Sequence, residues 1–98
     1  MKRIFISLPM ANKSEEEIKE ELDKRKSVLE QLSFEVADTY IKNNPNVKNI
    51  ALWCLGKSLE IMANCDIAYF CKGWNKARGC LVEYAAAVQY GLQVITED

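Results

Sequence analysis

Short apolar runs alternate along this chain with longer segments of helical periodicity, and this alternation limits the possible folds more than any other feature. Runs rich in apolar and β-branched residues lie at residues 3–8, 34–40, 66–71 and 92–95, each long enough for a buried strand. Between them, apolar residues recur three and four positions apart, the spacing of one helical face, and residues 43–46 form a turn cluster. We therefore expect the order strand, helix, strand, helix, strand, helix, strand.

The helices have recognisable starts and ends. Ser14 and Glu17 have the spacing of a capping box, so the first helix should cover residues 14–31. The third helix should end near Tyr90, with Gly91 as its C-terminal glycine. The buried stripe of the second helix should contain Leu52, Leu55, Leu59 and Met62.

This element order predicts the fold class. Strand–helix–strand units form right-handed crossovers between parallel strands, with helices on both faces of the sheet. We expect an α/β fold: a small flavodoxin-like or Rossmann-like three-layer sandwich with three helices and about four parallel strands in the order 2-1-3-4. The 98 residues, 49% of them hydrophobic, suffice for a single domain with its own core, residues 1–98. Ligands of such sheets bind where the strand order reverses, here between the first and third strands.

Residue composition restricts the chemistry. The chain has no histidine, so Ser-His and Cys-His nucleophile pairs and histidine metal sites are excluded. Its four cysteines, at positions 54, 65, 71 and 80, match no zinc-ligand spacing, and in a reducing compartment they should be free thiols of the core. We expect no metal site and no cofactor.

Charge and hydropathy restrict the partners. The net charge is −1 with acidic and basic residues interspersed, so a nucleic-acid polymer is not an expected partner. No segment approaches the roughly 20 apolar residues that cross a membrane, and the apolar run near the N-terminus is too short for a signal peptide. We expect a cytoplasmic protein without membrane association.

One carboxylate, Glu83, lies among small and apolar residues near the start of the third helix. It has two interpretations. In the structural one, Glu83 forms an ion pair with Lys72, Lys76 or Arg78, or caps local amides. In the functional one, it is a catalytic carboxylate, held ionised by the helix N-terminus and Arg78, that attacks an electrophilic carbon. We expect Glu83 to lie away from the face that packs on the sheet, which should contain Leu81, Tyr84, Ala85 and Val88.

Three motifs carry a resemblance. Ser7-Leu8-Pro9-Met10 follows the first strand, Ala-Asn-Cys-Asp at residues 63–66 leads into the third, and Gly73-Trp74 is followed by Arg78-Gly79-Cys80 and then Glu83. With these motifs the chain resembles the nucleoside 2-deoxyribosyltransferase superfamily. The resemblance is greatest to a branch of small, uncharacterised deoxyribosyltransferase-like proteins of bacteria and phages.

The resemblance implies a function and a set of site residues. Glu83 would be the nucleophile that attacks C1′ of the sugar and expels the base, and water or a second base would resolve the glycosyl-enzyme. The partner would be a nucleoside or nucleoside 5′-monophosphate. A homo-oligomer, a dimer or larger, is also expected, with Trp53, Tyr84 or Tyr90 in the interface. The implied substrate-binding residues are Ser7, Leu8, Pro9, Met10, Gly73, Trp74, Arg78 and Gly79.

The departures from the family pattern keep alternatives open. Ala77 and Ser58 replace a side chain that binds sugar or phosphate and an aspartate before the third strand, and the chain ends just after the fourth strand. A non-catalytic nucleotide-binding module, acting as a sensor or sequestering protein, is therefore the alternative to an enzyme. A purely structural interaction protein would have no concave site beside Glu83. Trp74 either stacks on the base or packs on the protein.

Overall fold

The computed structural model describes residues 1–39, 41 and 45–97, and its four strands form one parallel sheet in the order β2-β1-β3-β4. Ile4 pairs with Val36 of β2 and with Ile67 of β3, which places β1 in the middle of the sheet. The α/β class and the strand order expected from the sequence are confirmed. The strands are β1 (Arg3–Ser7), β2 (Glu35–Val36), β3 (Ile67–Phe70) and β4 (Gln93–Thr96).

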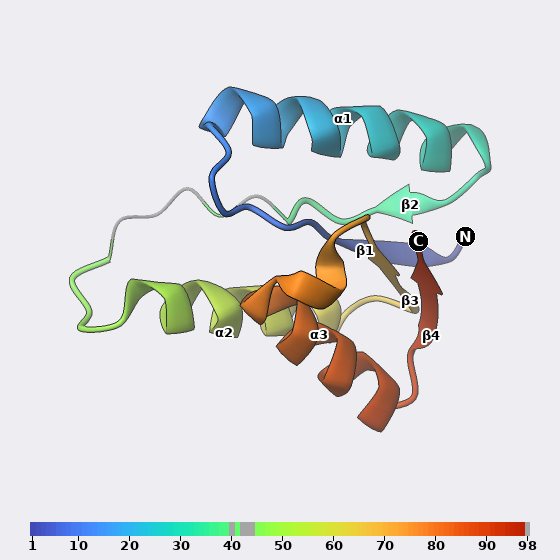
Figure 1. The fold of residues 1–98 in the computed structure, drawn as a ribbon. Helices are drawn as coiled ribbons and strands as arrows, with labels where there is room; N and C mark the ends of the chain where they lie inside the picture. The colour runs from blue at the N-terminus through green and yellow to red at the C-terminus, as the bar shows by residue number, and fades with distance from the viewer. Residues whose placement is uncertain (40, 42–44, 98) are drawn as a thin grey trace.

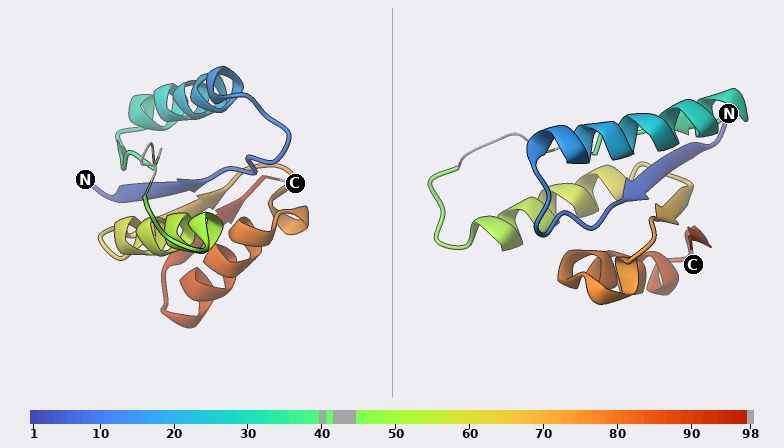
Figure 2. Two further views of the ribbon diagram at one scale, coloured as in Figure 1. Left: turned by 90° about the vertical axis from the view of Figure 1, so that its left-hand side faces the viewer. Right: turned by 45° about the horizontal axis from the view of Figure 1, so that its top comes forward.

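The helices cover both faces of the sheet. α1 (Glu15–Gln31) lies on one face, and α2 (Ile50–Met62) and α3 (Arg78–Gln89) lie on the other (Figure 1). Figure 2 shows the same three layers from two other directions. Among the described residues, no helix is both long enough and apolar enough to cross a membrane.

Alternating side chains of β1 divide the core into two halves. Ile4 and Ile6 pack with α1, whereas Phe5 belongs to the cluster beneath α2 and α3. Ser7 continues this alternation, so its hydroxyl faces α3. The sheet thereby places a polar group of its central strand beneath the helix that carries Glu83.

Predicted element ends are largely confirmed. Ser14 and Glu17 form the capping box, because each side chain accepts a hydrogen bond from the other's backbone N–H, at 3.3 and 3.1 Å. Tyr90 is the C-cap residue of α3, and Gly91 follows with a φ of 78°, a left-handed conformation that glycine adopts without strain.

The second strand is shorter than expected. Only Glu35–Val36 pair as a strand, and Ala37 donates one more hydrogen bond to the carbonyl of Ile4 at 2.9 Å. Beyond that point the chain leaves the sheet edge, and Thr39 becomes buried beside two cavities. Residue 40 of the predicted strand, and residues 43 and 44 of the turn cluster, lie outside the described residues.

Candidate functional site

A cavity of about 580 Å³ lies at the carboxyl end of β1, on the face of the sheet covered by α2 and α3. Its wall consists of residues 5–11, Thr39, one face of α2, residues 76–80 and Glu83. The volume is within the range of small-molecule sites, about 300–1,000 Å³. A concave site therefore lies beside Glu83. The purely structural interpretation predicted that no such site would exist there.

Most of the residues expected from the resemblance meet in this cavity. The four residues of the motif Ser7-Leu8-Pro9-Met10 line it on one side, and Arg78, Gly79 and Glu83 line it on the other. A Cβ added to Gly79 would meet nothing within 4 Å, so this end of the cavity is open. Residues separated by some 70 positions in the sequence thus form one site because β1 and α3 pack together.

Gly73 and Trp74 lie outside the cavity lining. The Trp74 ring is stacked on Tyr84, with centroids 4.4 Å apart and an interplanar angle of 21°, and lies 5.7 Å from the ring of Phe70. Of its two interpretations, the geometry shows packing on the protein. Gly73 has a φ of 92°, and a Cβ there would lie 3.6 Å from Pro9. Both residues therefore shape the loop before α3 rather than the cavity wall.

The expected packing face of α3 is wrong. Leu81 and Val88 are 44% and 49% exposed, and Ala85 is exposed too, whereas Tyr84 is only half-buried. The small side chains at positions 80 and 87 allow the helix to approach the sheet closely, and the acid between them finds a hydroxyl partner there. The buried residues of α3 are Cys80, Glu83 and Ala87.

The Glu83 carboxyl group is buried and held by hydroxyl groups. It is 8% exposed, and Ser7 Oγ donates a hydrogen bond to its Oε1 at 2.6 Å. Burial raises the pKa of Glu83, while hydrogen bonds from Ser7 and Ser58 lower it, and burial is the larger effect. Arg78 is not among the causes of this shift, so the expectation that Arg78 helps to hold the group ionised gains no support.

The ion-pair interpretation of Glu83 is not supported either. Among the described residues, the ion pairs involve other carboxylates, and Lys72, Lys76 and Arg78 make none with Glu83. The hydrogen bond that the carboxyl group accepts from Ser7 is instead a contact with a neutral group. Glu83 is thus a buried acid with neutral partners, in the wall of a cavity.

Sequence reasoning missed the wall contributed by α2. Leu52, assigned to the buried stripe, is 62% exposed, and the face toward the cavity is rotated from the expected one. The positions that line the cavity have the spacing i, i+3, i+4 and i+7. A helical face of mostly small residues was therefore the sequence pattern that could have indicated this wall. These residues are Ala51, Cys54, Leu55 and Ser58.

All four cysteines are free thiols, as predicted. Two of them, Cys71 and Cys80, are buried, and burial raises the pKa of Cys71 to about 12. Burial also raises the pKa of Cys80, which lines the cavity next to Glu83. Both thiols are therefore protonated at neutral pH and inert as nucleophiles.

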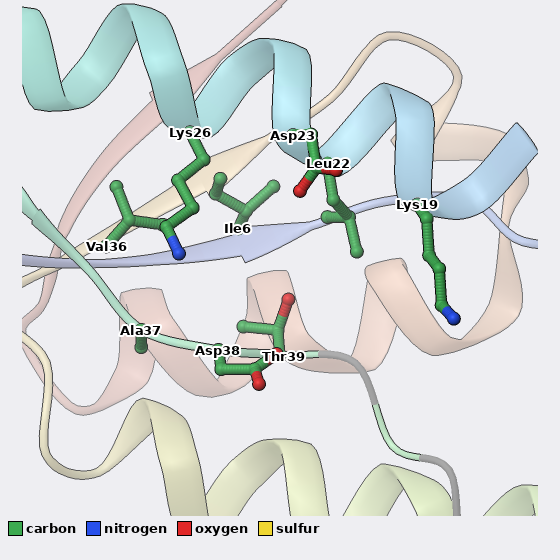
Figure 3. A pocket seen from close by; sticks show the side chains of 9 residues that line it. All are labelled: Ile6, Lys19, Leu22, Asp23, Lys26, Val36, Ala37, Asp38 and Thr39. Atoms are coloured by element: carbon green, nitrogen blue, oxygen red, sulfur yellow. The ribbon is translucent and has the colours of Figure 1, made fainter. Parts of the chain in front are cut away.

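A second, smaller cavity of about 270 Å³ lies on the other face of the sheet, beneath α1. Figure 3 shows Lys19, Asp23 and Lys26 reaching toward it from α1, and Thr39 lying across from them on the segment after β2. Ile6 and Thr39 line both cavities. None of the residues expected from the resemblance lines this second cavity.

The aromatic residues expected at a subunit interface differ in exposure. Tyr90 is 85% exposed, whereas Tyr84 is stacked on Trp74. Trp53 is half-buried, and the ammonium group of Lys57 lies 5.6 Å from its ring centroid. Assembly of the chain into a homo-oligomer stays a prediction.

No protein-family profile, no curated protein and no solved structure matches this chain. What the structure shows is a small α/β fold with a four-stranded parallel sheet and three helices. Because such folds carry many unrelated activities, the function has to be argued from the residues of the cavity.

Proposed function

We propose that this chain is an enzyme that cleaves or transfers at the N-glycosidic bond of a nucleoside or nucleoside 5′-monophosphate, with Glu83 as the nucleophile. The observation that carries the proposal is the buried Glu83 carboxyl group in the wall of a 580 Å³ cavity. The motif resemblance to the nucleoside 2-deoxyribosyltransferase superfamily supports it, since the whole Ser7–Met10 motif and the Arg78-Gly79-Cys80 and Glu83 part of another lie in this wall.

The chemistry takes two displacements at the same carbon. A Glu83 carboxylate oxygen forms a bond to C1′, the C1′–N bond breaks, and its electron pair leaves with the base, which takes up a proton from solvent. Water or a second base then attacks C1′, loses a proton, and releases the carboxylate. Negative charge fixed in a water-poor wall stabilises the positive charge that develops on the sugar.

The rest of the cavity suits the remaining parts of such a substrate. Phe5, Leu8 and Leu55 offer apolar surface to the faces of a base or sugar. Lys76 and Arg78 line the end of the cavity formed by the start of α3, and cationic side chains and first-turn amides favour an anionic group. We assign the 5′-phosphate of a nucleotide substrate to this end.

A second candidate function is a nucleotide-binding module without catalysis. Ala77 lines the cavity and offers no side-chain hydrogen bond to a sugar or phosphate. Glu83 is also the one carboxylate among the described lining residues, whereas glycosidic chemistry through a covalent intermediate ordinarily uses a pair. These two observations favour binding over turnover.

The deciding experiment measures base release. The purified protein is incubated with ribo- and deoxynucleosides and their 5′-monophosphates, with and without an acceptor base, and free or exchanged base is followed by chromatography. We expect release by the wild type and by Glu60→Gln, an exposed glutamate paired with Lys57 on α2, and no release by Glu83→Gln.

Other outcomes are equally informative. Release that persists in Glu83→Gln would contradict the role of this residue. No release, together with a thermal shift on addition of a nucleotide, would contradict the enzyme and support the binding module. Neither release nor binding for any member of the panel would overturn both functions.

A further inference from the structure

The Glu83 carboxyl group connects three elements of the fold. Ser7 is the last residue of β1 and donates to Glu83 Oε1 at 2.6 Å, while Ser58 of α2, through hydrogen bonding, lowers the pKa of the same carboxyl group. Since Glu83 belongs to α3, one acid joins the central strand to both helices on that face of the sheet. A hydrogen-bonding position shared by three elements leaves the carboxyl little rotational freedom.

Ser7 is a rigid donor. Its side chain is 2% exposed, its carbonyl accepts a hydrogen bond from Cys71 N at 2.9 Å, and it pairs with Phe70 of β3. The hydroxyl has a single proton, which it gives to Glu83. Burial raises the pKa of the neighbouring Cys80 thiol, so Cys80 adds no second negative charge beside Glu83 at neutral pH.

We propose that Ser7 is a positioning residue for Glu83: its hydroxyl holds Oε1 and, with Ser58, fixes the orientation of the carboxylate in the cavity wall. Two neutral hydroxyls thereby take the place that a second carboxylate occupies in paired-carboxylate sites. The catalytic consequence of this arrangement rests on the proposed function. The hydrogen bonds between the serines and Glu83 are independent of that function.

The charged and titratable groups around Glu83 are few. The pH at which Glu83 titrates therefore reports mainly on its hydrogen bonds to the serine hydroxyls. On the described part of the cavity wall, β1 contributes no titratable side chain. The titratable and cationic groups of the wall are Cys54 of α2, Cys80 and Arg78 of α3, and Lys76 before it. Hydrogen bonds to the ionised form favour ionisation, so removing the Ser7 hydroxyl should make Glu83 harder to ionise.

The test follows the Glu83 carboxyl carbon by ¹³C NMR as a function of pH, assigned by its loss in Glu83→Gln. The variants are Ser7→Ala, Ser58→Ala and the control Ser27→Ala, which removes an exposed hydroxyl on α1. We expect the titration midpoint to move to higher pH in the first two and to stay at the wild-type value in the third. An unchanged midpoint in a folded Ser7→Ala variant overturns the proposal.

Ser7 is buried, so its alanine variant could lose the fold. Ser7→Cys keeps the volume but offers a weaker donor, and it should raise the midpoint in the same direction. Ser58 is half-buried on a helix, where alanine is favourable, so Ser58→Ala provides a second test of the hydroxyl arrangement. A wild-type midpoint in both of these variants also overturns the proposal.

Activity supplies an independent measurement if base release is found. Loss of a hydrogen bond to a charged group should lower kcat about tenfold in Ser7→Ala, with little change in KM. The acid limb of kcat/KM, which reports the free enzyme, should move in the same direction as the NMR midpoint. Unchanged kcat contradicts the positioning role. Absence of base release contradicts the proposed function alone, because the NMR titration still decides the arrangement around Ser7.

Discussion

Glu97 and Glu83 differ in what surrounds their carboxyl groups. Glu97 follows β4 and accepts hydrogen bonds from Arg25 at 2.9 Å to each oxygen, from Tyr69 OH at 2.7 Å and from Lys72 N at 2.7 Å. These donors, Arg25 first, lower the pKa of Glu97 to about 2. Glu83 is more deeply buried, its partners are two hydroxyls, no cation of the described residues forms an ion pair with it, and its pKa is raised.

The two environments correspond to different roles. Arg25 belongs to α1, so the Glu97 cluster links this helix to the end of the sheet, and burial together with Glu97 raises the pKa of Tyr69 to about 12. Glu97 accepts four hydrogen bonds from groups of the protein and lines neither of the two cavities. Glu83 borders a cavity and has spare acceptor capacity. The pairing with Arg25 identifies Glu97 as a structural acid. The raised pKa of Glu83 beside a cavity identifies Glu83 as the candidate functional acid.

The largest effect on stability should come from removing the charge of Glu97. Glu97→Gln keeps the size of the side chain but loses the bidentate pairing with Arg25, and it should lower the free energy of unfolding by about 2 kcal/mol, allowing for screening by solvent. Urea denaturation at neutral pH measures the change. Glu60→Gln, which breaks an exposed ion pair with Lys57, should cost less than about 1 kcal/mol. Equal costs in the two variants would show that the Glu97 cluster is no stronger than a surface pair.

The same variant should show a defined pH dependence. The folded-state pKa of Glu97 lies near 2 and its ordinary value is 4.5. The wild-type advantage over Glu97→Gln should therefore be complete above pH 4.5 and disappear as the pH falls toward 2. Parallel curves throughout this window would contradict the pKa shift.

Glu83→Gln should have a smaller effect of opposite sign. Because the folded-state pKa of Glu83 is raised, its ionisation destabilises the folded protein. The neutral isostere should therefore stabilise the protein at pH 8 by on the order of 1 kcal/mol, as replacements at functional sites often do. The gain should disappear as the pH falls through the folded-state pKa, the reverse of the behaviour at Glu97. Thermal unfolding at several pH values checks this, and a loss of stability at pH 8 would show that the hydroxyls fully compensate the charge.

The features of the fold that the sequence predicts are those set by local patterns. Apolar runs separated by helical periodicity were enough for the order of strands and helices along the chain, and the Ser14–Glu17 spacing and Gly91 marked helix ends. These signals act over a few residues, where sterics and backbone hydrogen bonds decide the conformation.

The details that failed depend on contacts between distant residues. The α3 face was assigned from its larger apolar side chains, but Leu81 and Val88 are exposed, because the acid between them meets Ser7, 76 positions away in the sequence. Arg25 and Glu97 are likewise separated by 72 positions. Periodicity cannot report which hydroxyl or guanidinium group a distant acid will meet. The sequence therefore indicated Glu83 as a candidate site residue but did not indicate its hydrogen-bond partners.

Tyr69→Phe should have the smallest effect and refines the comparison. The variant removes one of the donors to Glu97 while the Arg25 and Lys72 hydrogen bonds remain, so the free energy of unfolding should fall by about 1 kcal/mol or less. Combined with Glu97→Gln in a double-mutant cycle, the two changes should be non-additive, because both act on one carboxyl group. Additive effects would mean that the Tyr69 hydroxyl acts independently of Glu97. The contrast between the two acids would then rest on the donors that remain to Glu97, the Arg25 guanidinium and the Lys72 backbone N–H.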